Sequence, residues 1–232
     1  MLTAFTKERR RRNRDRRALA AIRGGHGPSR WITGAGVLVV VVFAAVLVLT
    51  ITRNGVNRAA PASGMPAAPI TTADGLRTLP PWPAPRDAAD AVKRAGLPML
   101  GAEGAVQHFH AHLDVVVNGQ PVVVPADIGI DQRVGRISPL HTHDATGVLH
   151  VESPEQATFS LAQLFSEWEV SLSAAQLGGL DATPGSELRA YVNGKQVSGN
   201  PGAVTLHDHD EVALVYGPAP TPIPGSYDFG RL

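Results

Sequence analysis

Apolar and polar residues alternate along the chain from His108 to Val115. Successive side chains of an extended strand point to opposite faces, so this period of two predicts a β-strand with two unlike faces. One face would carry Phe109, Ala111, Leu113, Val115 and Val117. The other would carry His108, His110, His112 and Asp114. We therefore expect a strand that buries its apolar face and presents three histidines on the opposite side.

The word Val-Asn-Gly-x-x-Val occurs twice, with its Asn-Gly pair at residues 118–119 and 193–194. Asn-Gly between apolar runs is the strongest short-range signal for a two-residue hairpin turn, because both positions tolerate positive φ. The sequence therefore predicts two β-hairpins.

Two helices and a further set of strands are predicted around these hairpins. Ser160 and Gln163 form a capping box, and an apolar stripe at helical spacing follows in residues 161–168. Residues 87–95 form a shorter helical segment, residues 136–152 supply extra strands, and residues 211–216 form a closing strand. This order predicts a mostly antiparallel α+β domain, for which a β-grasp is one candidate arrangement.

The N-terminal part has a charge pattern unlike the rest of the chain. Residues 1–30 contain ten Lys or Arg and two acidic residues, and residues 31–52 contain no charged residue. Twenty-two residues at about 1.5 Å each reach roughly 33 Å, enough for a transmembrane helix. The basic segment would then stay in the cytoplasm, by the positive-inside rule. A signal peptide is the alternative, but its apolar core is usually only about 7–15 residues.

These features predict a single-pass protein of the cell membrane whose C-terminal domain is extracytoplasmic. Residues 53–85 are rich in proline and alanine and are expected to form an extended linker. The histidine-rich domain is expected at residues 86–217, and a loosely attached proline-rich tail at 218–232. A membrane-protein partner is conceivable, but nothing in the sequence identifies one. Nucleic acid is not expected, since no aromatic residues interleave with the arginines.

Six of the nine histidines lie between residues 108 and 150. Histidines two apart on a strand have Cα atoms about 6.6 Å apart, so two imidazoles can converge on one ion, whereas His108 and His112 are about 13 Å apart. The candidate metal ligands are His108, His110, His112, His141, His143 and His150. Carboxylates expected to orient these imidazoles by hydrogen bonding are Asp114, Asp144 and Glu152.

The ligand types restrict the ion that such a site would hold. Imidazole suits Zn, Cu(II), Ni and Fe, and the absence of cysteine excludes thiolate sites and blue copper. We expect a divalent transition metal, with Zn or Cu(II) favoured. His207 and His209 flank a predicted turn and are weaker candidates, and His26 has no evident role.

Several of these words resemble those of an uncharacterised group of bacterial and archaeal single-pass extracytoplasmic proteins. The words that carry the resemblance begin at His110, Ser138, Gly147 and Tyr191, and the resemblance spans residues 105–217. It implies a location outside the cytoplasm and no particular activity. The His-x-His on a strand is also similar to the zinc site of α-type carbonic anhydrases, in which His110, His112 and a third histidine would hold the ion.

Three functional hypotheses follow from the sequence. The first is a membrane-anchored extracytoplasmic protein for metal capture, delivery or sensing. The second is a metalloenzyme, a hydratase, hydrolase or dismutase, with three histidines on the ion and an activated water. The third is a partner-binding or pH-responsive domain whose histidines bind no ion. The sequence identifies no catalytic residue.

Overall fold

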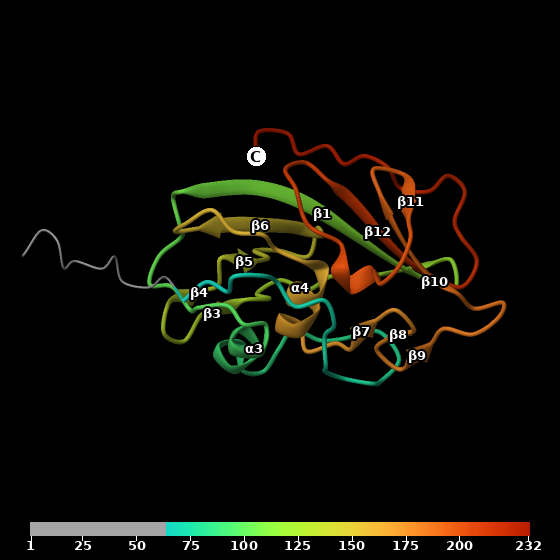
Figure 1. Ribbon diagram of the computed structural model, residues 1–232, viewed down its shortest axis with the longest axis horizontal. Coiled ribbons are helices and arrows are strands. Elements are labelled where there is room, and N and C mark those ends of the chain that lie inside the picture. The colour runs from blue at the N-terminus through green and yellow to red at the C-terminus, as the bar shows by residue number, and fades with distance from the viewer. Residues whose placement is uncertain (1–63) are drawn as a thin grey trace, which may run out of the picture. The chain divides into compact units, whose positions relative to one another are not determined.

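The computed structural model describes residues 64–232 as a mixed sheet with two α-helices on one side (Figure 1). The predicted basic segment 1–30 and transmembrane segment 31–52 lie outside the described residues. In the described part, no helix is both long and apolar enough to cross a membrane. The elements, in chain order, are α3 (Ala88–Arg94), β1 (Gln107–Val117), β2 (Gln120–Val122), β3 (Ile130–Asp131), β4 (Arg136–Ile137), β5 (Leu140–His141), β6 (Val148–Ser153), α4 (Leu161–Glu167), β7 (Leu172–Ser173), β8 (Gln176–Leu177), β9 (Leu180–Asp181), β10 (Leu188–Val192), β11 (Lys195–Val197), the 3₁₀ turn η1 (Pro201–Ala203) and β12 (Glu211–Tyr216).

The main sheet has the strand order β11-β10-β12-β1-β6-β5, and β2 also pairs with β1. Its neighbours are antiparallel except for β1 and β12, which run parallel. Two small sheets, β3-β4 and β7-β8-β9, lie outside it. This arrangement confirms the prediction of a mostly β, α+β domain.

Both predicted hairpins are present, as β1-β2 and β10-β11. Their turns have positive φ at Asn118 (52°) and Gly119 (77°), and at Asn193 (51°) and Gly194 (75°). Positive φ at both central residues is what a type I′ turn requires, which explains the Asn-Gly pairs. In the first hairpin β2 pairs with residues 115–117 of β1, β6 pairs with residues 107–112, and β12 runs parallel to residues 112–117.

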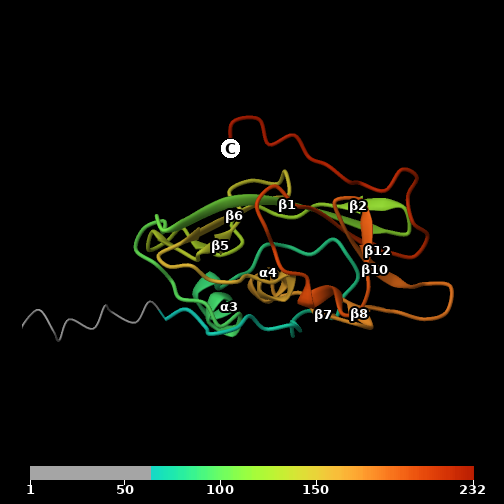
Figure 2. The same cartoon turned by 45° about the horizontal axis from the view of Figure 1, so that its top comes forward.

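The core lies between the main sheet and the two helices (Figure 2). Ala111, Leu113 and Val115 of β1 are buried there. The predicted capping box begins α4, because Ser160 Oγ accepts from Gln163 N and the Gln163 side chain accepts from Ser160 N. The apolar stripe of this helix is fully buried and consists of Leu161, Leu164, Phe165 and Trp168.

The opposite face of the sheet is apolar at one end only. Val116, Tyr191, Ala213 and Val215 form a small cluster there, and Ile223 of the C-terminal segment packs against it. Further along the segment, Tyr227 and Phe229 reach histidines of the domain. The loosely attached tail expected at 218–232 is therefore packed on this face, because it covers apolar side chains that water would otherwise contact.

The described part of the predicted linker, residues 64–85, packs against the domain. Trp82 is 2% exposed and meets Trp168 edge to face, with ring centroids 5.7 Å apart. Ala73 is also buried and pairs with Leu172. Proline and alanine content indicated a linker, but the burial of one large aromatic ring is enough to hold residues 73–82 against the domain.

Helix α4 ends in a carboxyl group that is buried in the interior. Glu167 is 0% exposed and accepts a hydrogen bond of 2.6 Å from Ser138 Oγ at Oε1, whereas its Oε2 has no partner. Burial raises its pKa well above 4.5, and the hydrogen bond from Ser138 only partly opposes this. The native Glu167 therefore keeps its proton where an unfolded glutamate has lost it.

Glu167→Gln should stabilise the domain at pH 8 and do so less at pH 4.5. The unfolded chain releases the proton as pH rises above the ordinary glutamate value, so wild-type stability falls with rising pH, and glutamine removes that dependence. Urea unfolding of both proteins at the two pH values measures the difference. An equal effect at both values would mean that Glu167 is ionised in the native state.

Candidate metal centre

Three histidines from three neighbouring strands form a row across the main sheet. His110 of β1 pairs with His150 of β6, and His150 pairs with His141 of β5. Directly opposed residues of adjacent strands lie on the same face, with Cβ atoms about 4.5–5.5 Å apart. The row is thus on the face opposite the core residues of β1.

The side chains of this row and its neighbours meet at their ring nitrogens. His110 Nε2 lies 3.1 Å from His150 Nδ1, and His141 Nε2 lies 3.2 Å from His143 Nε2. Two nitrogens on a tetrahedral zinc ion, at about 2.0–2.1 Å each, would be separated by about 3.4 Å. Neutral imidazoles that share a hydrogen bond have a similar spacing, so the pairs alone do not define a metal site.

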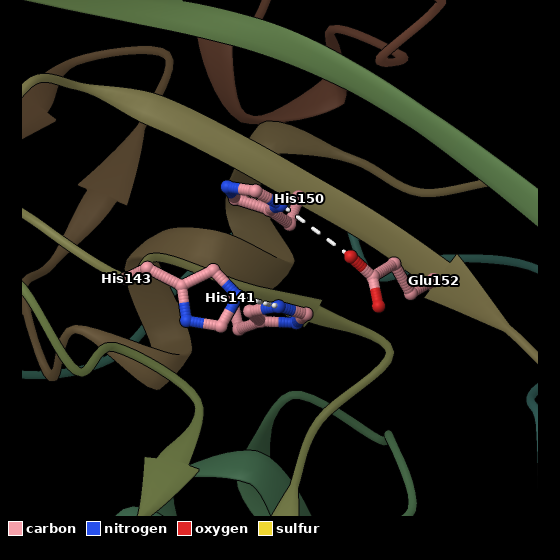
Figure 3. Close-up of side chains that lie close together, drawn as sticks. All are labelled: His141, His143, His150 and Glu152. Carbon is pink, nitrogen blue, oxygen red and sulfur yellow. Dashed lines mark hydrogen bonds and ion pairs between the residues drawn. The ribbon is translucent and has the colours of Figure 1, made fainter. Parts of the chain in front are cut away.

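Convergence of four donors is more informative than these pairs. His141, His143, His150 and Glu152 each offer one atom, and these atoms all lie within 4.8 Å of one another. We call these residues the central group. Figure 3 shows that His150 and Glu152 extend from β6 toward His141 and His143. The structure therefore contains a set of side chains close enough to hold a metal ion.

Two further groups satisfy the same spacing among the described residues. One consists of His108, His110 and Glu152, which we call the outer group. It shares Glu152 with the central group. The other consists of His112, Asp114 and Glu211. The structure thus divides the three histidines of β1 between two groups, as the 13 Å separation of His108 and His112 predicts.

His141 is held in the orientation that a ligand needs. Its Nδ1 donates to Ser138 O at 2.9 Å, so its Nε2 is left without hydrogen and faces the central group. Such a second hydrogen bond fixes the tautomer of metal-bound histidines. The Oγ of the same serine accepts from Leu140 N and donates to Glu167. Ser138 therefore connects the buried end of α4 to a candidate ligand.

Burial keeps His141 and His150 neutral. Desolvation, followed by the charges of the neighbouring histidines, lowers the pKa of His141 to about 3 and that of His150 to about 4. The pKa of Glu152 is raised, first by burial and then by the neighbouring carboxyl of Glu103. Uncharged imidazoles have lone pairs available at neutral pH, and a cation between them would favour the ionised form of Glu152.

One member of the central group borders open space. His143 is exposed and lies in the wall of a cleft of about 380 Å³. The remaining wall is formed by Gly101, Ala102, Glu103, Ile130, Gln132, Gly135, Arg136 and Ile137. Solvent and small molecules can therefore reach the central group from the His143 side.

His112 has a different set of contacts from the other histidines of β1. Its Nδ1 lies 2.7 Å from Glu211 Oε2, and its Nε2 lies 2.8 Å from Thr146 O. Thr146 O accepts from Nε2, and an ionised Glu211 accepts from Nδ1, which makes the ring an imidazolium. Burial raises the pKa of Glu211, and the hydrogen bond and charge of His112 oppose this rise. Burial alone would lower the pKa of His112, but the hydrogen bond and charge of Glu211, together with Thr146 O, raise it. The ring of Tyr227 stacks on it at 3.8 Å.

These contacts assign His112 to a buried ion pair and not to the row of histidines. The 2.7 Å separation is typical of a charge-assisted hydrogen bond. Gly147 makes the arrangement possible, because a Cβ there would lie 2.8 Å from His112 Nε2. The sequence predicted His112 as a metal ligand because it shares the polar face of β1 with His108 and His110. Its partner Glu211 is ninety-nine residues away along the chain, so the sequence pattern gave no sign of the ion pair.

The carboxylates expected to orient imidazoles occupy three different places. Glu152 belongs to the central and outer groups themselves, at 3.4 Å from His150 Nδ1. Asp114 lies beside the His112 pair. Asp144 accepts from Thr146 N at 2.9 Å, and hydrogen bonds from Thr146 lower its pKa. It therefore shapes the turn before β6.

The two weaker candidates, His207 and His209, join none of the three groups in the described chain. His207 Nδ1 lies 3.1 Å from Asp210 Oδ2, and the ring of His209 packs against Phe229. His26 lies outside the described residues. Sequence reasoning missed the roles of Glu103 and Ser138, since single residues of these types in loops carry no distinctive spacing.

His112→Leu should destabilise the domain by about 3–5 kcal/mol, the usual cost of leaving a buried charge without its partner. The double variant His112→Leu with Glu211→Leu should recover most of that loss, because no charge is then left buried. Urea unfolding measures both. If His112 were instead a ligand of the central ion, the single variant would also lose the metal that the wild type binds.

Comparison of this chain with protein-family models, curated proteins and solved structures finds no match in any of the three. The geometry of the histidine-rich face is therefore the basis on which a function is inferred.

Proposed function

We propose that this chain is a metal-binding protein whose ion is held by the central group, His141, His143, His150 and Glu152. The observation that carries the proposal is the convergence of three imidazoles and one carboxylate within 4.8 Å. The hydrogen bond from His141 Nδ1 to Ser138 O supports it, because it directs Nε2 toward the other donors. Neutral His141 and His150 add further support, since a protonated imidazole cannot bind an ion.

Zn or Cu(II) is the ion that this donor set favours. Three nitrogens and one oxygen complete a tetrahedral zinc shell, and imidazole also suits Cu(II). Four protein ligands would leave no open position, whereas exposed His143 gives the ion a route to solvent. This combination favours capture, delivery or sensing of an exchangeable ion.

We further propose that the domain acts outside the cytoplasm, anchored by residues 31–52 with residues 1–30 inside. The support is the sequence itself, with ten basic residues before a 22-residue uncharged segment. The metal would then be taken from, or delivered to, the extracytoplasmic space. The same proposal includes a membrane-protein partner. It does not include binding of nucleic acid.

Elemental analysis of the untagged 232-residue chain tests the proposal. After equilibration with Zn(II) and gel filtration, the wild type should retain bound metal, and His143→Ala should lose the ion of the central group. His143 is exposed, so its replacement should leave the fold intact. His207→Ala, an exposed histidine outside the three groups, is the matched control and should bind like the wild type.

Wild-type protein that retains neither Zn(II) nor Cu(II) would contradict the metal proposal. The partner-binding or pH-responsive hypothesis would then account better for the clustered histidines. Equal metal content in His143→Ala and the wild type would instead place the ion elsewhere in the chain.

The cleft beside His143 supports a second candidate function, a metalloenzyme with hydratase or hydrolase activity. If Glu152 leaves the ion during turnover, three histidines and a water remain, and such a water has its pKa lowered to about 7. The cleft of about 380 Å³ is adjacent to this position and would admit a small substrate.

Zinc-loaded protein should then hydrate carbon dioxide or hydrolyse an activated ester, with a rate that rises with pH through about 7 as the bound water ionises. Stopped-flow assays of the wild type and His143→Ala measure this activity. Stoichiometric zinc without turnover above the buffer rate would exclude these reactions and leave capture, delivery or sensing.

A further inference from the structure

The two histidines of the outer group, His108 and His110, are not used by the ion of the central group. They come from β1, whereas those of the central group come from β5, the turn after it, and β6. His110 and His141 are two strands apart in the row, about 9.6 Å, and His150 lies between them. The row therefore offers one position for an ion between β5 and β6 and a second between β6 and β1.

Glu152 stands between the two positions. Its Oε1 lies 3.4 Å from His150 Nδ1 and 3.6 Å from His108 Nε2. Glu152 and His150 are both on β6, the middle strand of the row, and their side chains point to the same face. The same oxygen, Oε1, therefore faces both positions.

We propose that the histidine-rich face holds two metal ions, with Glu152 bridging them. This inference rests on the proposed function, because it adds a second ion to the same site. The first ion is bound by His141, His143, His150 and Glu152. The second is bound by His108, His110 and Glu152, with water at its remaining positions.

The buried carboxyl group of Glu152 on the histidine-rich face favours the binding of cations. Glu152 Oε1 contacts His108 and His150, of which His150 is kept neutral by burial, and its acidic neighbour is the carboxyl of Glu103. Glu152 is 6% exposed, and burying a carboxylate beside another acidic group is unfavourable unless positive charge compensates. A bridging carboxylate also reduces the repulsion between two dications.

The two positions differ in their access to water. In the central group His143 is exposed, but His141 is fully buried and the His150 side chain is only 13% exposed, so two of the three imidazoles are screened from water. In the outer group His110 is buried, but the His108 side chain is 58% exposed. The first ion should therefore bind more tightly, and the second should exchange more readily.

The second ion has only three protein ligands and keeps water at its remaining positions. A small anion, such as a carboxylate or a phosphate, can bind there in place of water.

Titration of the untagged 232-residue chain with Zn(II), followed by calorimetry, tests the inference. The wild type should bind two equivalents in two steps, the second weaker than the first. His108→Ala should bind one tight equivalent and lose the second at concentrations that saturate the first. His207→Ala, also largely exposed, should bind two. Circular dichroism of each variant confirms that the fold is unchanged.

The possible stoichiometries separate this inference from the proposed function. No bound equivalent overturns both. A single equivalent that His143→Ala removes and His108→Ala retains overturns the second ion and leaves the central group standing. Two equivalents in His108→Ala also overturn the assignment. Repeating the titration with Co(II) tests the bridge, because two cobalt ions that share Glu152 should be magnetically coupled and Glu152→Gln should abolish the coupling.

Discussion

The register between β1 and β6 is the constraint on which the histidine-rich face depends. It aligns His110 with His150 and His108 with Glu152. A slip of one residue would turn every side chain of β1 to the other face, exposing Leu113 and burying its histidines. Burial of apolar side chains on the core face, at about 25 cal/mol for each Å², therefore fixes the positions of donors that never touch the core.

The core also reaches the candidate centre through hydrogen bonds. Ser138 donates to the buried carboxyl of Glu167 and accepts from His141, so the end of α4 and the edge strand β5 are held together beside the site. A buried carboxyl is unfavourable for stability when it must ionise, and glutamine would supply a similar acceptor. What Glu167 provides is a fixed position for Ser138, and through it for His141, at β5, the edge of the main sheet among residues 64–232.

The sequence predicted those features that depend on local pattern. Period-two alternation assigned the two faces of β1, Asn-Gly located both hairpins, and the capping box at Ser160 located α4. It could not predict the parallel pairing of β1 with β12, which brings Glu211 opposite His112. Candidate ligands were named by residue type and spacing, whereas their grouping depends on register between strands up to a hundred residues apart. The predicted membrane segment lies outside the described residues.

The ion pair of His112 separates this histidine from the central and outer groups. An imidazolium at that position repels a cation, and Tyr227 covers it from the outside. His108 and His143 are the exposed histidines of the two groups, so solvent reaches the proposed ions at these side chains. Because His141 is fully buried and His108 is mostly exposed, affinity and exchange are divided between the central and outer groups. An ion held by the buried donors can stay bound while one at the exposed donors is transferred, which a single closed shell of four ligands would not permit.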